Sequence, residues 1–372
     1  EHDELEQLVR AYEAFEALDP VGPVASVDER LATVAALREQ ARATAPAWQR
    51  VRAEVAADER FAGLDVAPQV GLIPLGRDAT SGLQEFAVFG SGVVPKRGDD
   101  GALVRDPKHG AVVMVLIPGG TTTIGAARGR PGAATGEAAP HVDDEASLAE
   151  GPVHDVLLDP FFLSKYEMTQ GQWQDLMGEN PSSWPVGQRA GEVTVTEAHP
   201  VESIPWQDVR RALRRLGLVL PTEVQWEHAV RAGTSTPWWC GATQASLPGN
   251  LNIADASVIR NRETWAGNAW NELDDGYVIH APVGTFPASP WGLHETLGNV
   301  REWCLDRYGT YEGPARPGDG LRMEHYEADL IVTRGGSYSS RVIQSRVSAR
   351  GRTNADLAET WVGIRPARAI DR

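Results

Sequence analysis

Residues 220–229 read LPTEVQWEHA, and this stretch decides how the surrounding chain is interpreted. Thr222 is a favoured residue for the N-terminal cap of a helix, and Val224, Trp226 and Ala229 follow at spacings that place them on one face. We therefore predict a helix over 221–232 that turns a tryptophan toward the interior of the protein.

The flanking sequence predicts further short elements. Helices are expected at 169–177, with Thr169 as the cap, and at 206–216. Strand signals occur at 70–75 and 86–89, and the apolar run AVVMVLI at 111–117 predicts a buried strand. Between 233 and 365 few segments are periodic, which predicts irregular loops held by buried rings or by metal.

Composition bounds the class of protein. The chain has 372 residues and a formal net charge of −16, which argues against nucleic acid or an anionic membrane as the main partner. No apolar run is long enough for a transmembrane helix. The 38 glycines and 12 tryptophans, against 7 phenylalanines, favour a loop-rich fold. Two cysteines leave the compartment open, with a cytoplasmic location favoured.

The first sixty residues differ from the rest. Apolar residues recur at spacings of three and four over 5–18 and again over 31–55, with Pro20 and Pro23 between the two runs. This pattern predicts a helical hairpin, with Ser26 or Asp28 capping the second helix. The hairpin would pack on a neighbouring domain or serve as a coiled-coil dimer handle. We divide the chain into a helical hairpin at 1–60, a strand-rich connecting segment at 61–110 and a main domain at 111–372.

Ordered motifs of the main domain resemble the formylglycine-generating-enzyme family, also called the sulfatase-modifying-factor domain. The motifs are VLIPGG at 115–120, FFLSKYEMT at 161–169, LPTEVQWEHA at 220–229, GNVREW at 298–303, RGGSY at 334–338 and GIRPA at 363–367. The resemblance implies an α+β fold of the C-type lectin type. A helical segment before such a domain is also similar to the C-terminal parts of some large bacterial proteins, including kinase-linked ones.

The resemblance implies a copper centre that this sequence does not supply. Catalytic members bind copper through two cysteines between the Gly-Gly-Ser motif and a later arginine motif, and residues 337–350 contain no cysteine. Cu(I) requires soft sulfur ligands, which hydroxyls do not replace. Cys240 and Cys304 lie in other segments, and Arg301 stands where the enzymes usually have tryptophan. We therefore expect no copper and a non-catalytic member of the family.

An alternative is a metal-dependent oxygenase. Sulfoxide synthases of the same superfamily hold iron with histidines, mostly from an N-terminal helical domain. The nine histidines here include no pair at helical spacing of three or four. An iron site would therefore require distant histidines to converge.

Oxygen-rich loops predict structural calcium, which binds six to eight hard oxygen ligands. By the family resemblance, one site would use the side chains of Asn252 and Asp275 and the carbonyls of Ile253 and Tyr277. A second site would use Glu295, Glu302 and the carbonyls of Gly298 and Val300. The alternative is that these carboxylates cap turns or pair with arginine.

The segment 334–365 lines the ligand-binding face in lectin-like folds. Its mixture of tyrosine, serine, asparagine and tryptophan is typical of recognition surfaces. The layout resembles the variable proteins of diversity-generating retroelements, although an ordinary surface of a non-enzymatic relative fits equally. We predict a protein or small-molecule ligand contacting Tyr338, Ser339, Ser340, Arg341, Val342, Ile343, Asn354 and Trp361.

Overall fold

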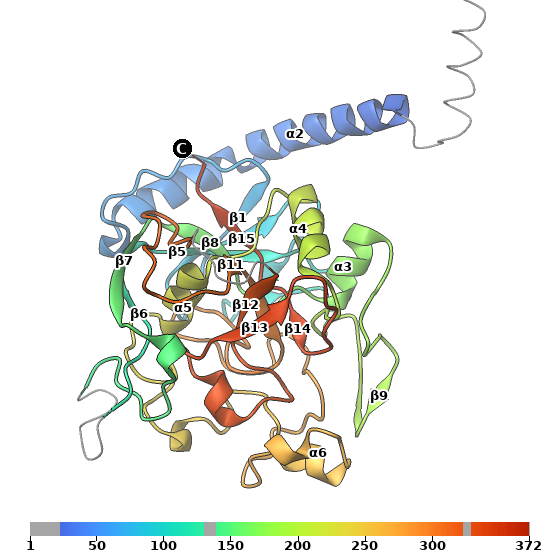
Figure 1. The fold of residues 1–372 in the computed structure, drawn as a ribbon. Coiled ribbons are helices and arrows are strands. Elements are labelled where there is room, and N and C mark those ends of the chain that lie inside the picture. Colours follow the sequence, from blue (N-terminus) through green and yellow to red (C-terminus); the bar gives the residue numbers. More distant parts are fainter. Residues whose placement is uncertain (1–22, 130–138, 323–328, 372) are drawn as a thin grey trace, which may run out of the picture.

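The computed structural model describes residues 23–129, 139–322 and 329–371 (Figure 1). Short helices and strands alternate with long loops. The helices are α2 (Pro23–Ala56), α3 (Gln170–Met177), α4 (Trp206–Arg215), α5 (Glu223–Arg231) and α6 (Ala256–Arg260), with 3-10 turns η1 (Glu59–Phe61), η3 (Leu148–Glu150), η4 (Gln244–Ser246), η5 (Ala266–Asn268) and η6 (Val342–Ser345). None of these helices is both long and apolar enough to cross a membrane.

Two sheets organise the chain. The first has the order β1-β2-β5-β8-β15, built from β1 (Leu72–Arg77), β2 (Gln84–Val88), β5 (Val113–Ile117), β8 (Phe161–Ser164) and β15 (Ala367–Ala369). The second has the order β13-β12-β11-β14, built from β13 (Gly351–Asn354), β12 (Leu330–Arg334), β11 (Arg301–Arg307) and β14 (Val362–Gly363). Two-stranded ribbons pair β3 (Lys96–Arg97) with β4 (Leu103–Val104), β6 (Gly120–Ile124) with β7 (His154–Leu158), and β9 (Arg189–Ala190) with β10 (Val193–Thr194).

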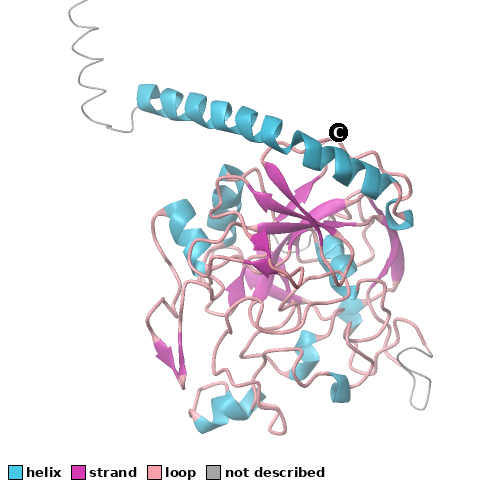
Figure 2. Ribbon diagram, turned by 180° about the vertical axis from the view of Figure 1, so that it is seen from behind, coloured by secondary structure: helices cyan, strands magenta, loops and turns pink. Residues whose placement is uncertain are grey.

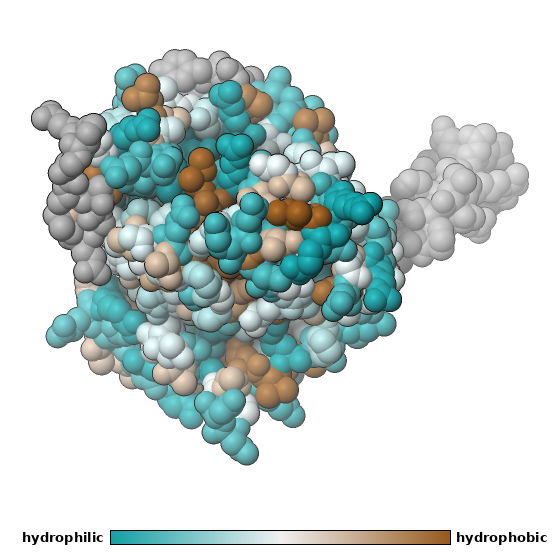
Figure 3. Space-filling model, turned by 90° about the horizontal axis from the view of Figure 1, so that it is seen from below, coloured by the Kyte–Doolittle hydropathy of each residue, from teal (hydrophilic) through white to brown (hydrophobic). Residues whose placement is uncertain are grey.

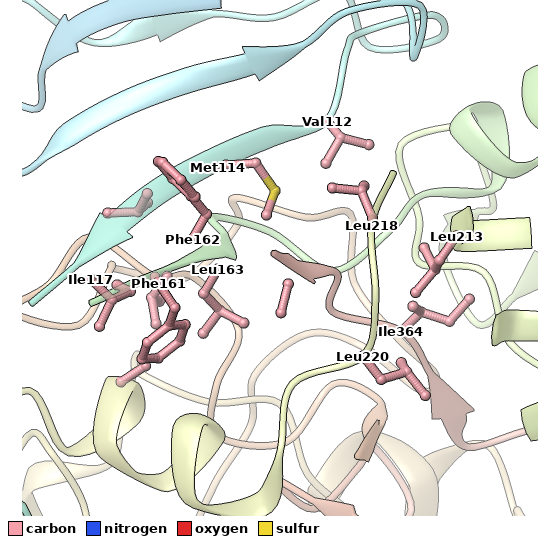
Figure 4. Packing of buried hydrophobic residues seen from close by; sticks show 14 of the residues in the cluster. Val112, Met114, Ile117, Phe161, Phe162, Leu163, Leu213, Leu218, Leu220 and Ile364 are labelled. Carbon is pink, nitrogen blue, oxygen red and sulfur yellow. The ribbon is translucent and has the colours of Figure 1, made fainter. Parts of the chain in front are cut away.

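The main core lies between the five-stranded sheet and the helices beside it. Figure 4 shows Met114 and Phe162 of the sheet on one side, with Leu213 of α4 and Leu220 on the other. All four side chains are fully buried. Long apolar runs such as 113–117 are buried on every residue, which is why that strand reads as continuously apolar rather than alternating.

Helix α2 is anchored through its C-terminal half. Trp48, Val51 and Val55 are buried, and the Trp48 ring stacks on Phe86 of β2 with centroids 5.1 Å apart. The preceding part is largely exposed from Leu31 onward and projects beyond the rest of the protein (Figure 2). The helix begins at Pro23, so neither Ser26 nor Asp28 is its cap. The first helix of the predicted hairpin lies outside the described residues.

The three helices predicted at 169–177, 206–216 and 221–232 are present as α3, α4 and α5. Thr169 and Thr222 each accept a backbone hydrogen bond from the third residue of their helix, as expected of N-terminal caps. The strands expected at 70–75, 86–89 and 111–117 correspond to β1, β2 and β5. Because β1 and β2 continue the sheet that contains β5, the sheet crosses the boundary that we drew at residue 111.

Candidate ligand pocket and metal sites

A pocket of about 170 Å³ opens where β11, β12 and β13 meet η6 and the loop before β7. Arginine and glutamate side chains dominate its walls. The lining residues are Glu145, Ser147, Glu150, Arg301, Thr333, Arg334, Gly335, Gly336, Ile343, Gln344, Arg346, Ala349, Arg350 and Gly351. The pocket thus combines the start of β11 with the segment 334–351 that follows β12.

Two of these arginines join β12 and β13 to α5. Arg334 is fully buried, pairs with Glu227, and lies 3.5 Å from the carboxylate of Glu223. Arg350 forms two 2.7 Å hydrogen bonds with Glu223. Burial lowers the pKa of Arg334, but the neighbouring acidic groups, of which Glu227 acts most strongly, together raise it. These arginines therefore have their charges neutralised within the fold.

A third arginine fastens the loop before β7. Arg346 pairs with Asp143 at 2.6 Å and with Glu150 at 2.9 Å, and all three side chains are buried. Glu150 also accepts hydrogen bonds from Ser348 and from the backbone of Ser147. This network holds one wall of the pocket in place.

Arg301 is different from its neighbours. Nη1 of its guanidinium lies 2.1 Å from the point where a Cβ on Gly351 would stand. Among the described residues no carboxylate pairs with it within 4.0 Å, and burial lowers its pKa without an opposing charge. Beside it, the buried Thr333 hydroxyl has no hydrogen-bond partner among those residues. The pocket therefore holds an unneutralised cation and an unused hydroxyl at one place.

The structure divides the predicted ligand-contacting residues. The placement of Tyr338 on a binding surface is wrong: its side chain is 1% exposed, and its hydroxyl contacts Trp184 Nε1 and the Thr360 carbonyl. Ser340 is also buried, because its hydroxyl accepts a hydrogen bond from the backbone of Ser337 in a tight turn. The side chains of Tyr338 and Ser340 therefore lie beneath the predicted binding surface.

The other predicted residues remain accessible to different degrees. Ser339, Val342 and Ile343 are half-buried, and only Ile343 of the predicted set lines the pocket. Arg341 is exposed at the start of η6, and Asn354 is half-buried at the end of β13. Trp361 is 37% exposed beside β14. Arg301 and Thr333 were not in the predicted set. The family resemblance had nevertheless pointed to Arg301, which stands where tryptophan was expected.

The first predicted metal site is assembled as a cluster. The Asp275 carboxylate accepts hydrogen bonds from the amides of Tyr277, at 2.8 Å, and Ile253, at 3.2 Å. Oδ1 of the buried Asn252 has no partner among the described residues. Asp255, which the sequence reasoning missed, accepts a hydrogen bond from the Asp275 amide while capping α6. Burial and the Asp255 charge raise the pKa of Asp275 to about 8.

At the second predicted metal site, an arginine side chain supplies the positive charge. Arg365 donates to both oxygens of Glu302, at 2.7 to 3.0 Å, and the Trp226 indole donates to the same carboxylate. Glu295 instead accepts from the amides of Gly284 and Phe286, and burial raises its pKa to about 7. The carbonyl-bearing residues Gly298 and Val300 lie in the same buried loop. Glu302 thus has an ionic partner already.

The profile of the sulfatase-modifying factor enzyme 1-like domain matches residues 100–370. The chain belongs to this family. The formylglycine-generating enzyme of Streptomyces coelicolor is 30% identical over 204 residues, covering 50% of this chain and 58% of that protein. The corresponding enzyme of Thermomonospora curvata is 28% identical over 313 residues, covering 71% of this chain and 95% of that protein. The chain thus spans little more than half of the first relative.

One solved structure agrees with the fold, and a second is similar to a lesser degree. PvdO from Pseudomonas aeruginosa matches with a TM-score of 0.54 and 24% identity over 70% of this chain and 95% of that one. Treponema denticola variable protein 1 matches with a TM-score of 0.49 and 21% identity over 70% of this chain and 96% of that one. The fold is the loop-rich α+β type of C-type lectin that was expected for this family.

The family context makes the positions of the thiols and histidines informative. Cys304 is fully buried within β11, Cys240 is half-buried in a separate loop, and both are free thiols with pKa values raised by burial. The rings of His199 and His280 pack edge to face, with centroids 5.4 Å apart. In the described part of the chain, no three histidine, cysteine, aspartate or glutamate residues are arranged to hold a metal ion.

Proposed function

We propose that this chain is a non-catalytic, ligand-binding member of the formylglycine-generating-enzyme family. One observation carries the proposal: residues 337–350 contain no cysteine, and the pocket beside them presents arginine, hydroxyl and backbone groups. Such groups form hydrogen bonds and ion pairs with a ligand but do not bind Cu(I). Recognition is therefore the chemistry that this pocket supports best.

The surface around the pocket suits a polar ligand. Figure 3 shows the face opposite α2, where apolar residues lie in separate small groups among polar ones. Large contiguous apolar patches are the usual mark of a permanent protein interface. We propose that Arg341, Ile343 and Trp361, which retain exposed surface, contribute to recognition at this face. Tyr338 and Ser340 would act beneath it by fixing the loop.

We propose one structural calcium ion, held at the loop that precedes and follows α6. Asp255 and Asp275 bring two carboxylates together in a partly buried place, where burial, and after it their mutual repulsion, raises the pKa of Asp275. Calcium favours carboxylate, amide and carbonyl oxygens, and Asn252, Ile253 and Tyr277 would supply the others. A bound ion would neutralise the pair and join two loops that have few regular hydrogen bonds.

At the second site we propose that the Arg365 guanidinium, rather than a calcium ion, neutralises Glu302. Its guanidinium satisfies Glu302 and also donates to the carbonyls of Ser164, Lys165 and His294. A calcium ion bound to Glu302 would have to displace these contacts or share the carboxylate with them. The calcium content expected of the chain is therefore one ion.

Metal analysis of the purified protein tests the function. We expect about one calcium per chain, no stoichiometric iron or copper, and no oxygen uptake with thiol substrates. Asp275→Asn should abolish calcium retention, whereas Asp274→Asn, at an exposed neighbour that pairs with Arg260, should not. Stoichiometric iron with thiol-dependent oxygen consumption would instead establish the alternative oxygenase function.

A further inference from the structure

Among the described residues, no carboxylate lies within ion-pair distance of Arg301. The other arginines of the pocket are matched to Glu223, Glu227, Glu150 or Asp143. Moving a cation from water into a protein interior without a partner costs several kcal/mol in general. An unpaired cation that lines a pocket is a candidate partner for a negative group on a ligand.

The Arg301 guanidinium occupies space that only a glycine at position 351 leaves free. A Cβ at Gly351 would stand 2.1 Å from Arg301 Nη1 and 2.5 Å from Thr333 Oγ1, so any other residue there would displace one of them. Both polar atoms therefore lie beside the same backbone position, on the wall that β12 and β13 form by pairing Thr333 with Gly351. The unpartnered hydroxyl of Thr333, which is 0% exposed, is a second donor at this place.

We propose that Arg301 and Thr333 bind the carboxylate of a small monoanionic ligand. This inference deepens the proposed recognition function and rests on it. A carboxylate offers two coplanar oxygens, which match a guanidinium in a bidentate contact and leave a lone pair for a hydroxyl donor. The pocket volume of about 170 Å³ fits a small acid group, with the rest of the ligand extending toward Ile343 and Gln344.

The charge balance favours a carboxylate over phosphate or sulfate. One unpaired guanidinium neutralises one negative charge. Glu145 lines the same pocket, so a second negative charge on the ligand would be repelled. A dianionic phosphate would therefore bind more weakly than a carboxylate of similar size.

Titration calorimetry on the full chain, saturated with calcium, tests the proposal. The probes are N-acetylglycine and benzoate, their uncharged amides, inorganic phosphate and sulfate. We expect the two acids to bind, and the amides, phosphate and sulfate to bind at least about tenfold more weakly, which corresponds to about 1.4 kcal/mol.

Arg301→Gln should weaken the binding of the acids by about tenfold or more. Gly351→Ala should also weaken it by displacing the guanidinium. Arg214→Gln is the matched control, because Arg214 is exposed on α4 away from the pocket.

Thermal unfolding provides a second measurement that separates binding from structure. Arg301→Met removes a half-buried charge that has no ion-pair partner among the described residues, so without ligand it should raise the melting temperature by a few degrees while abolishing acid binding. A structural arginine would give the opposite shift. The inference is overturned if neither acid binds, if acids and amides bind equally, or if Arg301→Gln binds as the parent does. In these cases the recognition function would stand, because it fails only if the metal analysis finds stoichiometric iron or copper and oxygen is consumed.

Discussion

The pair formed by Arg365 and Glu302 offers the sharpest test of how the second loop site is held. Arg365 is 0% exposed and Glu302 is 1% exposed. Removing one partner of a buried pair generally costs about 3–5 kcal/mol, because the other charge remains buried. Arg365→Met would also leave three carbonyls without their donor. We expect it to lower the free energy of unfolding by about 3–5 kcal/mol.

A double-mutant cycle isolates the contribution of the pair. Glu302→Gln retains the acceptor for the Trp226 indole but removes the charge, so it should also destabilise strongly. The double variant should cost less than the sum of the two single variants, with a coupling of about 1–3 kcal/mol. Urea unfolding followed by tryptophan fluorescence gives these values, measured first in chelator and then in calcium.

Two results would refute this assignment. If Arg365→Met lost less than about 1 kcal/mol, the pair would not organise the loop. If Glu302→Gln, with Arg365 intact and the fold preserved, lowered the calcium content by one ion per chain, Glu302 would be a metal ligand. The exchange of Glu302 should instead leave the single calcium near α6 in place.

Two further predictions concern acid stability and the N-terminal helix. Burial lowers the pKa of His199 to about 4 and that of His280 to about 3, so between pH 6.5 and these values the unfolded chain binds protons that the folded chain does not. Stability should therefore fall on acidification from pH 6.5, by about 1.4 kcal/mol per pH unit for each histidine, and His280→Phe should make the slope of urea-derived stability against pH smaller. Trp48→Ala should cost about 3–5 kcal/mol, whereas Leu31→Ala, at a side chain that is 61% exposed, should change thermal stability little; equal losses would show that the projecting half of α2 is packed as well.

The helices could be predicted because their signals are local. Thr169 and Thr222 each exchange hydrogen bonds with a glutamine three residues later, so the cap and its partner lie within one turn of sequence. The buried strand at 113–117 was likewise evident from five consecutive apolar residues. These interactions depend little on the rest of the chain, and composition and spacing were sufficient.

The pocket could not be predicted in the same way, because distant residues determine it. Tyr338 reads as a recognition residue, but Trp184, 154 positions earlier in the chain, binds its hydroxyl inside the protein. The importance of Arg301 depends on Gly351, which pairing of β12 with β13 brings beside it. The sequence also gave no reason to place Asp255 next to Asp275, because the two lie twenty positions apart with α6 and η5 between them.

The buried ion pairs that hold the fold together are distinct from the residue that we propose binds the ligand, so the binding chemistry can change while the fold is kept. Arg334 and Arg350 join the four-stranded sheet to α5 through buried carboxylates, and each is costly to replace because its partner would remain charged. Arg301 has no such partner among the described residues, so the proposed ligand, rather than the framework, would constrain its identity. A thiol-bearing segment can therefore be lost, and a guanidinium gained, without disturbing the pairs that hold the sheet and helix together. On this reasoning, the unneutralised arginine is the residue from which the ligand of the pocket should be sought.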